Sequence, residues 1–254
     1  MIPRSYMQAD QFLPKTAGSG VFVEIGSDFG FSFGLEGGEG STEYLARLAE
    51  THQTVLHTVD IRNCENKTVN NTNIVWHTGK GSEWAQKTYP SINKRISLLY
   101  LDNYFFIQPN DLALSISEQT KKLSWNETTY NTIKGHDWPQ KFTKFDDLPQ
   151  WCQDEVLTEF RSHWDQMNYD TESDYKKFGL KISNQNSQLE HFKQIYYLLP
   201  WLDHESLIIL DDTGMFGGVW YGKCGPGVVL LQTLGFKIKK INVRTVIMQG
   251  KENE

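Results

Sequence analysis

The chain has 254 residues, of which 39% are hydrophobic and 22% charged, and its net charge at pH 7 is −6. This composition is typical of a globular protein with one large core, so we expect a single domain over residues 1–254. The acidic balance disfavours a nucleic-acid partner, and the lack of a signal-peptide core or of an apolar run of roughly 18 residues disfavours a membrane partner and predicts a cytoplasmic protein.

The N-terminal segment differs in character from the rest of the chain. Residues 1–20 contain Pro3, Pro14 and a Gly-Ser-Gly run. Such residues interrupt helices and strands. We therefore predict that this segment is an arm or a lid over a ligand mouth.

A glycine-rich turn follows the first predicted strand. Residues 21–25 are β-branched, aromatic or aliphatic apart from Glu24, and Gly26, Ser27 and Gly30 come next. This pattern is typical of a buried parallel strand that passes into a loop where the backbone approaches a ligand. A purely structural strand-to-helix turn would have the same pattern.

The helix after this turn is predicted to begin near Ser41, with Ser41 or Thr42 as its N-cap. Its core, residues 42–49, has apolar residues at helical spacing. Because the preceding segment is rich in glycine, two turns could meet the ligand, one at Gly30 and one at residues 38–42.

The second predicted strand, residues 54–60, ends in Asp60. A carboxylate at the carboxyl end of this strand can accept hydrogen bonds from both hydroxyls of a ribose. Asp60 therefore indicates a nucleoside cofactor, although a strand-end acid without a ligand would look the same.

A third strand is predicted over residues 73–77. The turn after it contains Gly81 and Ser82 and leads into a short helix, which we expect to end at Pro90. Trp84 lies in this helix, where it could cover a cofactor base or pack the helix against the core.

The fourth predicted strand, residues 96–102, is apolar up to Asp102, as expected for a central parallel strand that ends in a functional group. The stretch that follows is far longer than an ordinary connection between a helix and a strand. We predict that residues 108–185 form an inserted helical lid over the active-site edge. Its aromatic residues would line an acceptor pocket or, in the simpler alternative, form the core of the insertion.

The α/β pattern resumes with a capping box at residues 187–190, which predicts a helix to about Leu199. The fifth strand is predicted over residues 206–212 and ends in Asp211 and Asp212. A mobile glycine-rich loop, a short helix and a closing antiparallel hairpin are predicted over residues 214–227, 228–234 and 236–248. The elements together predict an α/β fold with a Rossmann-like, doubly wound sheet of about seven strands, mostly parallel with a C-terminal antiparallel hairpin, plus a helical insertion after the fourth strand.

Three acids end neighbouring strands of this predicted sheet: Asp102, Asp211 and Asp212. Three carboxylates at one edge raise each other's pKa values unless a cation lies between them. Oxygen ligands of this kind suit Mg²⁺, which can bind an acceptor hydroxyl and lower its pKa. The alternative is that these acids are structural and bind no metal.

The first strand and its turn resemble motif I of the class I S-adenosylmethionine-dependent methyltransferases, in which an E/D-x-G-x-x-x-G loop wraps the methionine part of the cofactor. Glu24, Gly26 and Gly30 stand at the motif positions. The resemblance implies S-adenosyl-L-methionine as the cofactor. The residues it implies as cofactor-binding are Glu24, Gly26, Ser27, Gly30, Ser41, Asp60, Gly81, Ser82 and Asp102.

The ends of the fourth and fifth strands resemble those of the cation-dependent O-methyltransferases, the catechol and caffeoyl-CoA type and their sugar-modifying relatives. The resemblance implies Mg²⁺ bound by Asp102, Asp211 and Asp212, with Asp102 taking part in catalysis. These enzymes place a lysine base shortly after the fourth-strand acid, whereas Asn103 and three aromatic residues follow here. His191, on the helix expected at the same edge, is the substitute candidate for the catalytic base; alternatively the metal alone acidifies the hydroxyl.

We therefore predict an S-adenosylmethionine-dependent methyltransferase that acts on a hydroxyl of a small acceptor, a sugar or a phenol, with the help of a divalent metal. The alternatives are a metal-independent methyltransferase with a histidine base and a methyltransferase-fold binding subunit without turnover. A nicotinamide oxidoreductase would also use Asp60, but it should show a G-x-G-x-x-G turn, which this sequence lacks. The sequence leaves the oligomeric state open, with a homodimer among the alternatives.

Overall fold

The computed structural model describes residues 5–27, 40–63, 73–103, 184–216, 219–242 and 245–250. Gly30, the loop before Gly40 and nearly all of the insertion predicted over residues 108–185 lie outside these ranges. The expectations for those segments are therefore neither confirmed nor contradicted.

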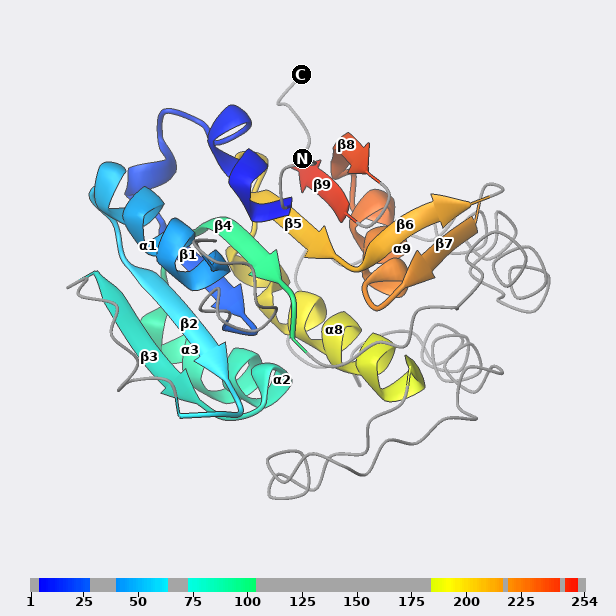
Figure 1. Ribbon diagram of the computed structural model, residues 1–254, viewed down its shortest axis with the longest axis horizontal. Helices are drawn as coiled ribbons and strands as arrows, with labels where there is room; N and C mark the ends of the chain where they lie inside the picture. The colour runs from blue at the N-terminus through cyan, green and yellow to red at the C-terminus, as the bar shows by residue number, and fades with distance from the viewer. Residues whose placement is uncertain are drawn as a thin grey trace.

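The central sheet has seven strands in the order β3-β2-β1-β4-β5-β9-β8 (Figure 1). Strands β1 to β5 pair in parallel, whereas β9 is antiparallel to both β5 and β8. The strands are β1 (Val21–Ile25), β2 (Leu56–Asp60), β3 (Ile74–Thr78), β4 (Ile96–Leu101), β5 (Leu207–Asp211), β8 (Lys237–Asn242) and β9 (Thr245–Gln249). The predicted Rossmann-like sheet with its C-terminal antiparallel hairpin is confirmed.

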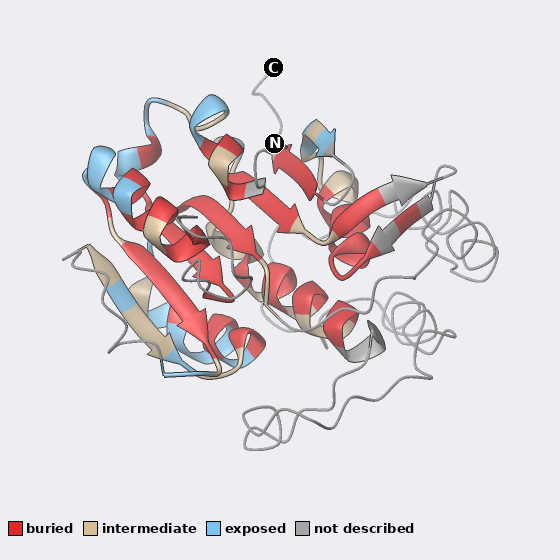
Figure 2. Ribbon diagram, in the orientation of Figure 1, coloured by how far each residue is buried: buried red, intermediate tan, exposed pale blue. Residues whose placement is uncertain are grey.

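Successive residues of each central strand point to opposite faces of the sheet and into two separate apolar clusters. In β1, Val23 belongs to the cluster beneath α8 and α9, and Phe22 to the cluster beneath η1 and α1. Both faces of the central strands are therefore buried, as Figure 2 shows. The helices are η1 (Ser5–Gln11), η2 (Ala17–Ser19), α1 (Ser41–Thr51), α2 (Gly81–Glu83), η4 (Trp84–Thr88), α3 (Tyr89–Ile92), α8 (Asn184–Leu198), η7 (Leu199–Trp201) and α9 (Gly225–Thr233).

The described part of the N-terminal segment, residues 5–20, packs against the core and does not form the arm or lid that was predicted over residues 1–20. Tyr6 and Ala9 of η1 are buried against the sheet, and the Tyr6 ring contacts Tyr100 of β4 edge-on. Arg95, just before β4, donates to the backbone oxygen of Thr16. The apolar residues between the prolines therefore decide how this segment packs, because burying them outweighs the local breakers.

Helix α1 begins at the predicted place, but its N-cap is Gly40 rather than Ser41 or Thr42. The backbone N–H of Gly40 donates to Glu43 at 2.9 Å. The hydroxyls of Ser41 and Thr42 are used elsewhere, because both donate to Glu24.

The helix after β3 continues past Pro90, which we expected to end it. A π-helical turn, η4, separates α2 from α3, and the N–H of Tyr89 donates to the oxygen of Trp84. The wider turn accommodates the missing N–H of Pro90, because the regular hydrogen-bond ladder is already shifted there.

Helix α8 begins at Asn184, one turn before the predicted capping box. Ser187 therefore lies inside the helix, and Glu190 binds Ser82 instead of capping. The glycine-rich stretch after β5 is also more regular than predicted. It forms a hairpin of β6 (Thr213–Phe216) and β7 (Val219–Gly222), followed directly by α9.

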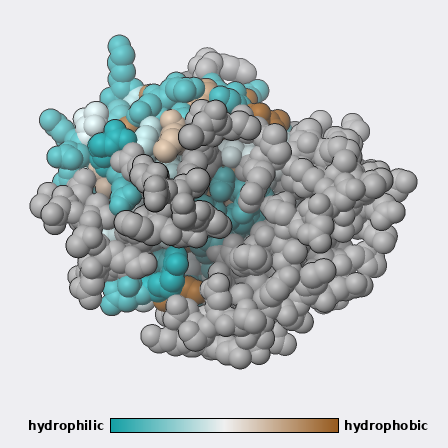
Figure 3. All heavy atoms as spheres, in the orientation of Figure 1, coloured by the Kyte–Doolittle hydropathy of each residue, from teal (hydrophilic) through white to brown (hydrophobic). Residues whose placement is uncertain are grey.

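Within the described ranges, no helix is long and apolar enough to cross a membrane. On the face drawn in Figure 3, the described side chains are mostly hydrophilic. Among all the described residues, only two large hydrophobic side chains are exposed, Val75 and Ile241. The described surface therefore shows no extended apolar patch.

Candidate functional site

The sheet order reverses between β1 and β4, and Gly26 lies at this point. Strands β2 and β3 follow on one side of β1, and β5 on the far side of β4. In open α/β sheets, ligands bind at the carboxyl ends of the strands at such a switch point. Gly26 has φ of 101°, and a Cβ at this position would clash with the backbone of Asn103. The turn after β1 therefore requires glycine, because the ends of β1 and β4 approach closely there.

Glu24 is completely buried and anchors the start of α1. Its carboxylate accepts hydrogen bonds from Ser41 at 2.5 Å, Thr42 at 2.8 Å and Thr58 at 2.7 Å. Burial raises the pKa of Glu24 to about 8, although the three hydroxyl donors lower it. Glu24 and Ser41, both predicted to bind the cofactor, are thus placed beside the switch point with their side chains bonded to each other.

Asp60 lies at the carboxyl end of β2, as predicted, and faces the turn after β1. The backbone N–H of Ser27 donates to Asp60 Oδ2 at 3.0 Å. Arg62 donates to the same carboxylate through Nε at 3.0 Å and through Nη2 at 3.1 Å. Because the Arg62 side chain is 47% exposed, a ribose diol could displace it from Asp60.

Gly81 and Ser82 lie beside α8. Ser82 donates to Glu190 through both its backbone N–H and its hydroxyl, each at 2.8 Å. A Cβ on Gly81 would clash with the side chains of Ile25 and Gln194. In this structure both residues fasten α2 to α8, and their predicted contact with an adenine stays a prediction.

Trp84 packs into the core, where it meets a pair of histidines. Its ring lies 5.1 Å from that of His77 and 5.2 Å from that of Tyr89. His57 Nδ1 lies 3.1 Å from His77 Nε2, and burial lowers the pKa of His57 to about 4. Of the two roles considered for Trp84, the structure shows the packing role.

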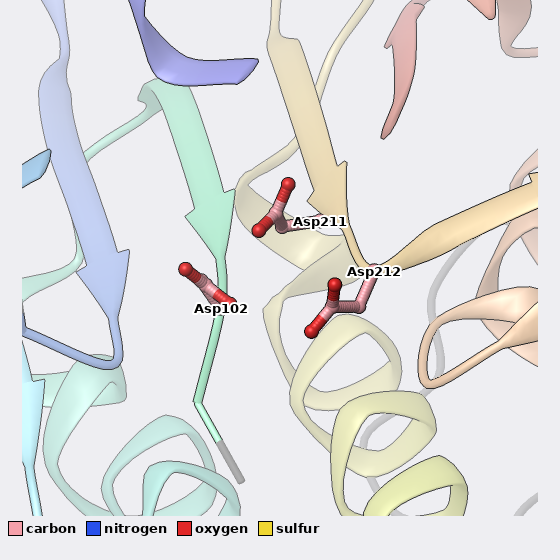
Figure 4. Close-up of side chains that lie close together, drawn as sticks. All are labelled: Asp102, Asp211 and Asp212. Carbon is pink, nitrogen blue, oxygen red and sulfur yellow. The ribbon is translucent and has the colours of Figure 1, made fainter. Parts of the chain in front are cut away.

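The three acids predicted as a metal site do come together. Figure 4 shows Asp102 after β4 facing Asp211 and Asp212 at the end of β5, and carboxylate oxygens of all three lie within 4.8 Å of one another. Tyr100 donates to Asp102 Oδ2 at 2.9 Å, and Thr245 of β9 donates to Asp211 Oδ1 at 3.2 Å. We call these three residues the acidic trio.

A buried lysine lies among the acidic trio. Lys223 Nζ is 2.5 Å from Asp102 Oδ1 and 3.3 Å from Asp212 Oδ2, and the side chain is only 2% exposed. Burial lowers the pKa of Lys223, but the nearby carboxylates of Asp102, Asp212 and Asp211 raise it by more than burial lowers it. The pKa of Lys223 is therefore raised overall. The ammonium group is therefore the counter-ion of the trio.

The β6-β7 hairpin places Lys223 at this point. Its two ends meet where the backbone N–H of Lys223 donates to the oxygen of Asp212 at 3.2 Å. Gly222 has φ of 91°, and a Cβ there would clash with the same oxygen. Cys224 N–H donates to Thr213 Oγ1 at 3.0 Å. The chain thus returns to the end of β5 within one tight hairpin and delivers the lysine.

The position of Lys223 conflicts with the predicted binding of Mg²⁺ by the trio. The oxygen donors of the trio suit the metal, but the Lys223 ammonium already contacts two of the three carboxylates. A divalent cation placed among them would be repelled by the lysine at short range. The trio would fit Mg²⁺ only if Lys223 left its position.

His191 lies next to this cluster but is completely buried. Its Nδ1 lies 2.6 Å from the backbone oxygen of Ser187, which makes Nδ1–H the donor, and its Nε2 meets no hydrogen-bond partner among the described residues. Burial, together with Lys223, lowers the pKa of His191 to about 3, against the raising effects of the Ser187 backbone oxygen and of Asp212. The imidazole is therefore neutral, and its burial does not favour the predicted role as a base that touches an acceptor.

Sequence reasoning missed three residues of the site: Lys223, Arg62 and Glu190. Lys223 was hidden in a stretch that its glycines marked as a mobile loop. An alternative signal was available, because three acids converging on one edge require a cation, and the lysine in the glycine-rich stretch after the fifth strand can supply it. Arg62, two residues after Asp60, could have been expected as its partner for a similar reason.

No protein-family model and no curated protein matches the sequence. Among solved structures, the calicheamicin methyltransferase CalS11 aligns with 96% of this chain and 77% of its own, at 9% sequence identity and a TM-score of 0.43. This similarity is too weak to carry a functional assignment, which has to come from the residues of the site.

Proposed function

We propose that this protein is an S-adenosylmethionine-dependent methyltransferase that transfers a methyl group to a hydroxyl of a small acceptor such as a sugar or a phenol. The observation that carries the proposal is the convergence of Gly26, Asp60 and Asp102 at the switch point of a sheet in the order β3-β2-β1-β4-β5-β9-β8. This is the place where a nucleoside cofactor binds in open α/β sheets, and the antiparallel β9 agrees with the resemblance drawn from the sequence.

Two residues would hold the cofactor. The Asp60 carboxylate can accept hydrogen bonds from both ribose hydroxyls once Arg62 moves aside. Gly26 would contribute through its backbone, because its positive φ makes the tight turn that places Ser27 beside Asp60. When bound, S-adenosylmethionine supplies an electrophilic methyl group.

Asp102 is the residue that we assign to the acceptor. Its side chain is 26% exposed, and it ends the strand next to the Gly26 turn. Lys223 and Tyr100 each donate to one of its oxygens and fix the orientation of the carboxylate. Asp102 can then accept the acceptor hydroxyl's proton while the oxygen forms the new bond to carbon and the carbon–sulfur electron pair stays on sulfur.

Calorimetric titration tests cofactor binding. We expect S-adenosylhomocysteine to bind the wild-type protein and to bind Asp60→Ala at least about tenfold more weakly, the loss of roughly one charged hydrogen bond. Glu50→Ala, on the exposed side of α1, is the control and should bind as the wild type does. Binding of NADH with no binding of S-adenosylhomocysteine would overturn the proposal in favour of an oxidoreductase.

A second assay separates an enzyme from a binding subunit. Release of S-adenosylhomocysteine is measured with a panel of sugars and phenols, for the wild type and for Asp102→Asn. Turnover that Asp102→Asn loses at unchanged cofactor affinity is the expected result. Cofactor binding without turnover on any acceptor would favour the binding subunit.

A further inference from the structure

The negative charge of the acidic trio is compensated by groups of the protein itself. Three carboxylates lie within 4.8 Å of one another at the ends of β4 and β5. Such a group is stable only if positive charge or hydrogen-bond donors compensate it. The compensation here comes from within the chain, because each carboxylate has a protein donor: Tyr100 and Lys223 for Asp102, Lys223 for Asp212, and Thr245 for Asp211.

Lys223 occupies the position at which a metal would have to sit. A cation shared by Asp102 and Asp212 must lie between their facing oxygens, and Lys223 Nζ is already there, at 2.5 Å and 3.3 Å. The lysine is 2% exposed, so little water screens its charge. A second cation would therefore meet a strong local repulsion.

The backbone around Lys223 is also fixed by hydrogen bonds, so the position of the side chain does not depend on its ion pairs alone. Its N–H donates to Asp212, its neighbour Gly222 accepts from Gln188 of α8 at 3.1 Å, and Cys224 donates to Thr213. Hydrogen bonds on both sides of the lysine thus fix where its side chain starts. Moving the ammonium away would also leave two carboxylates close together without a counter-ion.

We infer that Lys223 is the resident cation of the acidic trio and takes the place of a divalent metal, so that Lys223 positions Asp102 and Asp212 and the protein does not need Mg²⁺ there. The inference concerns the charge of the trio alone and does not rest on the proposed methyl transfer. It predicts the opposite metal behaviour from that of the cation-dependent enzymes that the sequence resembles.

The test is a titration with Mn²⁺, whose free concentration is read by electron paramagnetic resonance, and with Mg²⁺ by calorimetry. Chelator-treated wild-type protein should show no stoichiometric site. Lys223→Met leaves the three carboxylates without a cation and should bind Mn²⁺ at least about tenfold more tightly than the wild type. Lys223→Arg keeps the charge and should stay without a site. The double variant Lys223→Met/Asp211→Asn lacks one of the carboxylate ligands, so it should not show the tighter Mn²⁺ binding of Lys223→Met.

Two results would overturn the inference. One is a stoichiometric Mn²⁺ site in the wild type that Asp211→Asn abolishes. The other is a folded Lys223→Met variant that binds Mn²⁺ no better than the wild type. If Lys223→Met does not fold, the test is the nuclear magnetic resonance signal of the Lys223 ammonium in the wild type, which is assigned by its loss in Lys223→Arg. Selective broadening of this signal by substoichiometric Mn²⁺ contradicts the inference, and an unchanged signal supports it. S-adenosylhomocysteine titrations run in parallel report separately on the proposed function.

Discussion

Lys223 and Asp102 are 121 residues apart in the sequence, yet Nζ of the lysine lies 2.5 Å from Oδ1 of the aspartate. Because the lysine is buried, removing it leaves carboxylates without their counter-ion, and we expect Lys223→Met to lower the free energy of unfolding by about 3 kcal/mol. Urea denaturation measures this, with Lys237→Met on exposed β8 as the control. In a double-mutant cycle with Asp102→Asn, the two losses should sum to more than the loss in the double variant; strict additivity would mean that the pair is not coupled.

Glu24 predicts an unusual loss of stability toward alkaline pH. Its pKa is raised from 4.5 to about 8 in the folded protein, mainly by burial. The protonated acid therefore stabilises the fold fully below pH 4.5, and this contribution is lost as the pH rises through about 8. Glu24→Gln cannot ionise, so its stability relative to the wild type should increase across this interval. Chemical denaturation at both ends of the interval gives the comparison, and parallel pH profiles for the two proteins would contradict the assignment.

Gly26 predicts a steric effect that a second glycine separates from backbone strain. Gly26 and Gly79 both have positive φ, 101° and 155°. A Cβ at Gly26 would clash with the backbone of Asn103, whereas at Gly79 no atom of the described residues lies within 4 Å of it. Gly79→Ala should cost about 1 kcal/mol for the backbone conformation alone. Gly26→Ala should cost at least about 1 kcal/mol more. Thermal and urea unfolding of both variants measure the difference. Equal losses of stability would mean that the backbone conformation, and not the clash with Asn103, destabilises Gly26→Ala.

Arg62 and Asp60 predict opposite effects on cofactor binding. Both Arg62 Nε and Nη2 donate to the Asp60 carboxylate. If a ribose must take this carboxylate, Arg62 competes with it, so Arg62→Ala should bind S-adenosylhomocysteine at least as tightly as the wild type. Asp60→Asn keeps the shape but loses the charge and should bind about tenfold more weakly. Calorimetry checks both, and equal weakening by the two variants would mean that the ion pair itself forms the binding surface.

His57 predicts a loss of stability in acid. Burial, with smaller contributions from His77 and Lys94, lowers its pKa from 6.5 to about 4. The neutral ring thus stabilises the fold above pH 6.5, and this contribution is lost as the pH falls through about 4. His57→Gln should therefore lose less stability than the wild type between these two pH values, as measured by denaturant unfolding. A variant that loses as much would point to other groups, such as His77.

The strands and their order were predictable because their side chains carry the pattern. Strands β4 and β5 are apolar runs with acids at their carboxyl ends, and Gly26 marks the turn after β1. The convergence of Asp102 with Asp211 and Asp212 followed from the order alone, since the carboxyl ends of neighbouring parallel strands share one edge.

What escaped prediction depended on contacts between distant residues. The packing of Tyr6 against Tyr100 shows itself only once the sheet exists. The hairpin that leads to Lys223 was predicted as a loop, because a glycine such as Gly222 is expected both in a loop and at the end of a hairpin strand. Likewise, Glu190 fits a capping box by spacing, but Ser82 of another helix provides the stronger partner.

The position of β9 between β5 and β8 has a consequence for how the protein is made. Thr245 begins β9 and donates to Asp211, and Lys223 enters the site only after the β6-β7 hairpin has closed. During synthesis the strands from β1 to β5 emerge first, so their acids appear on the nascent chain before the groups that neutralise them. The candidate site is therefore among the last parts of the molecule that can assemble, and a chain stopped before Lys223 would leave the acidic trio without its counter-ion.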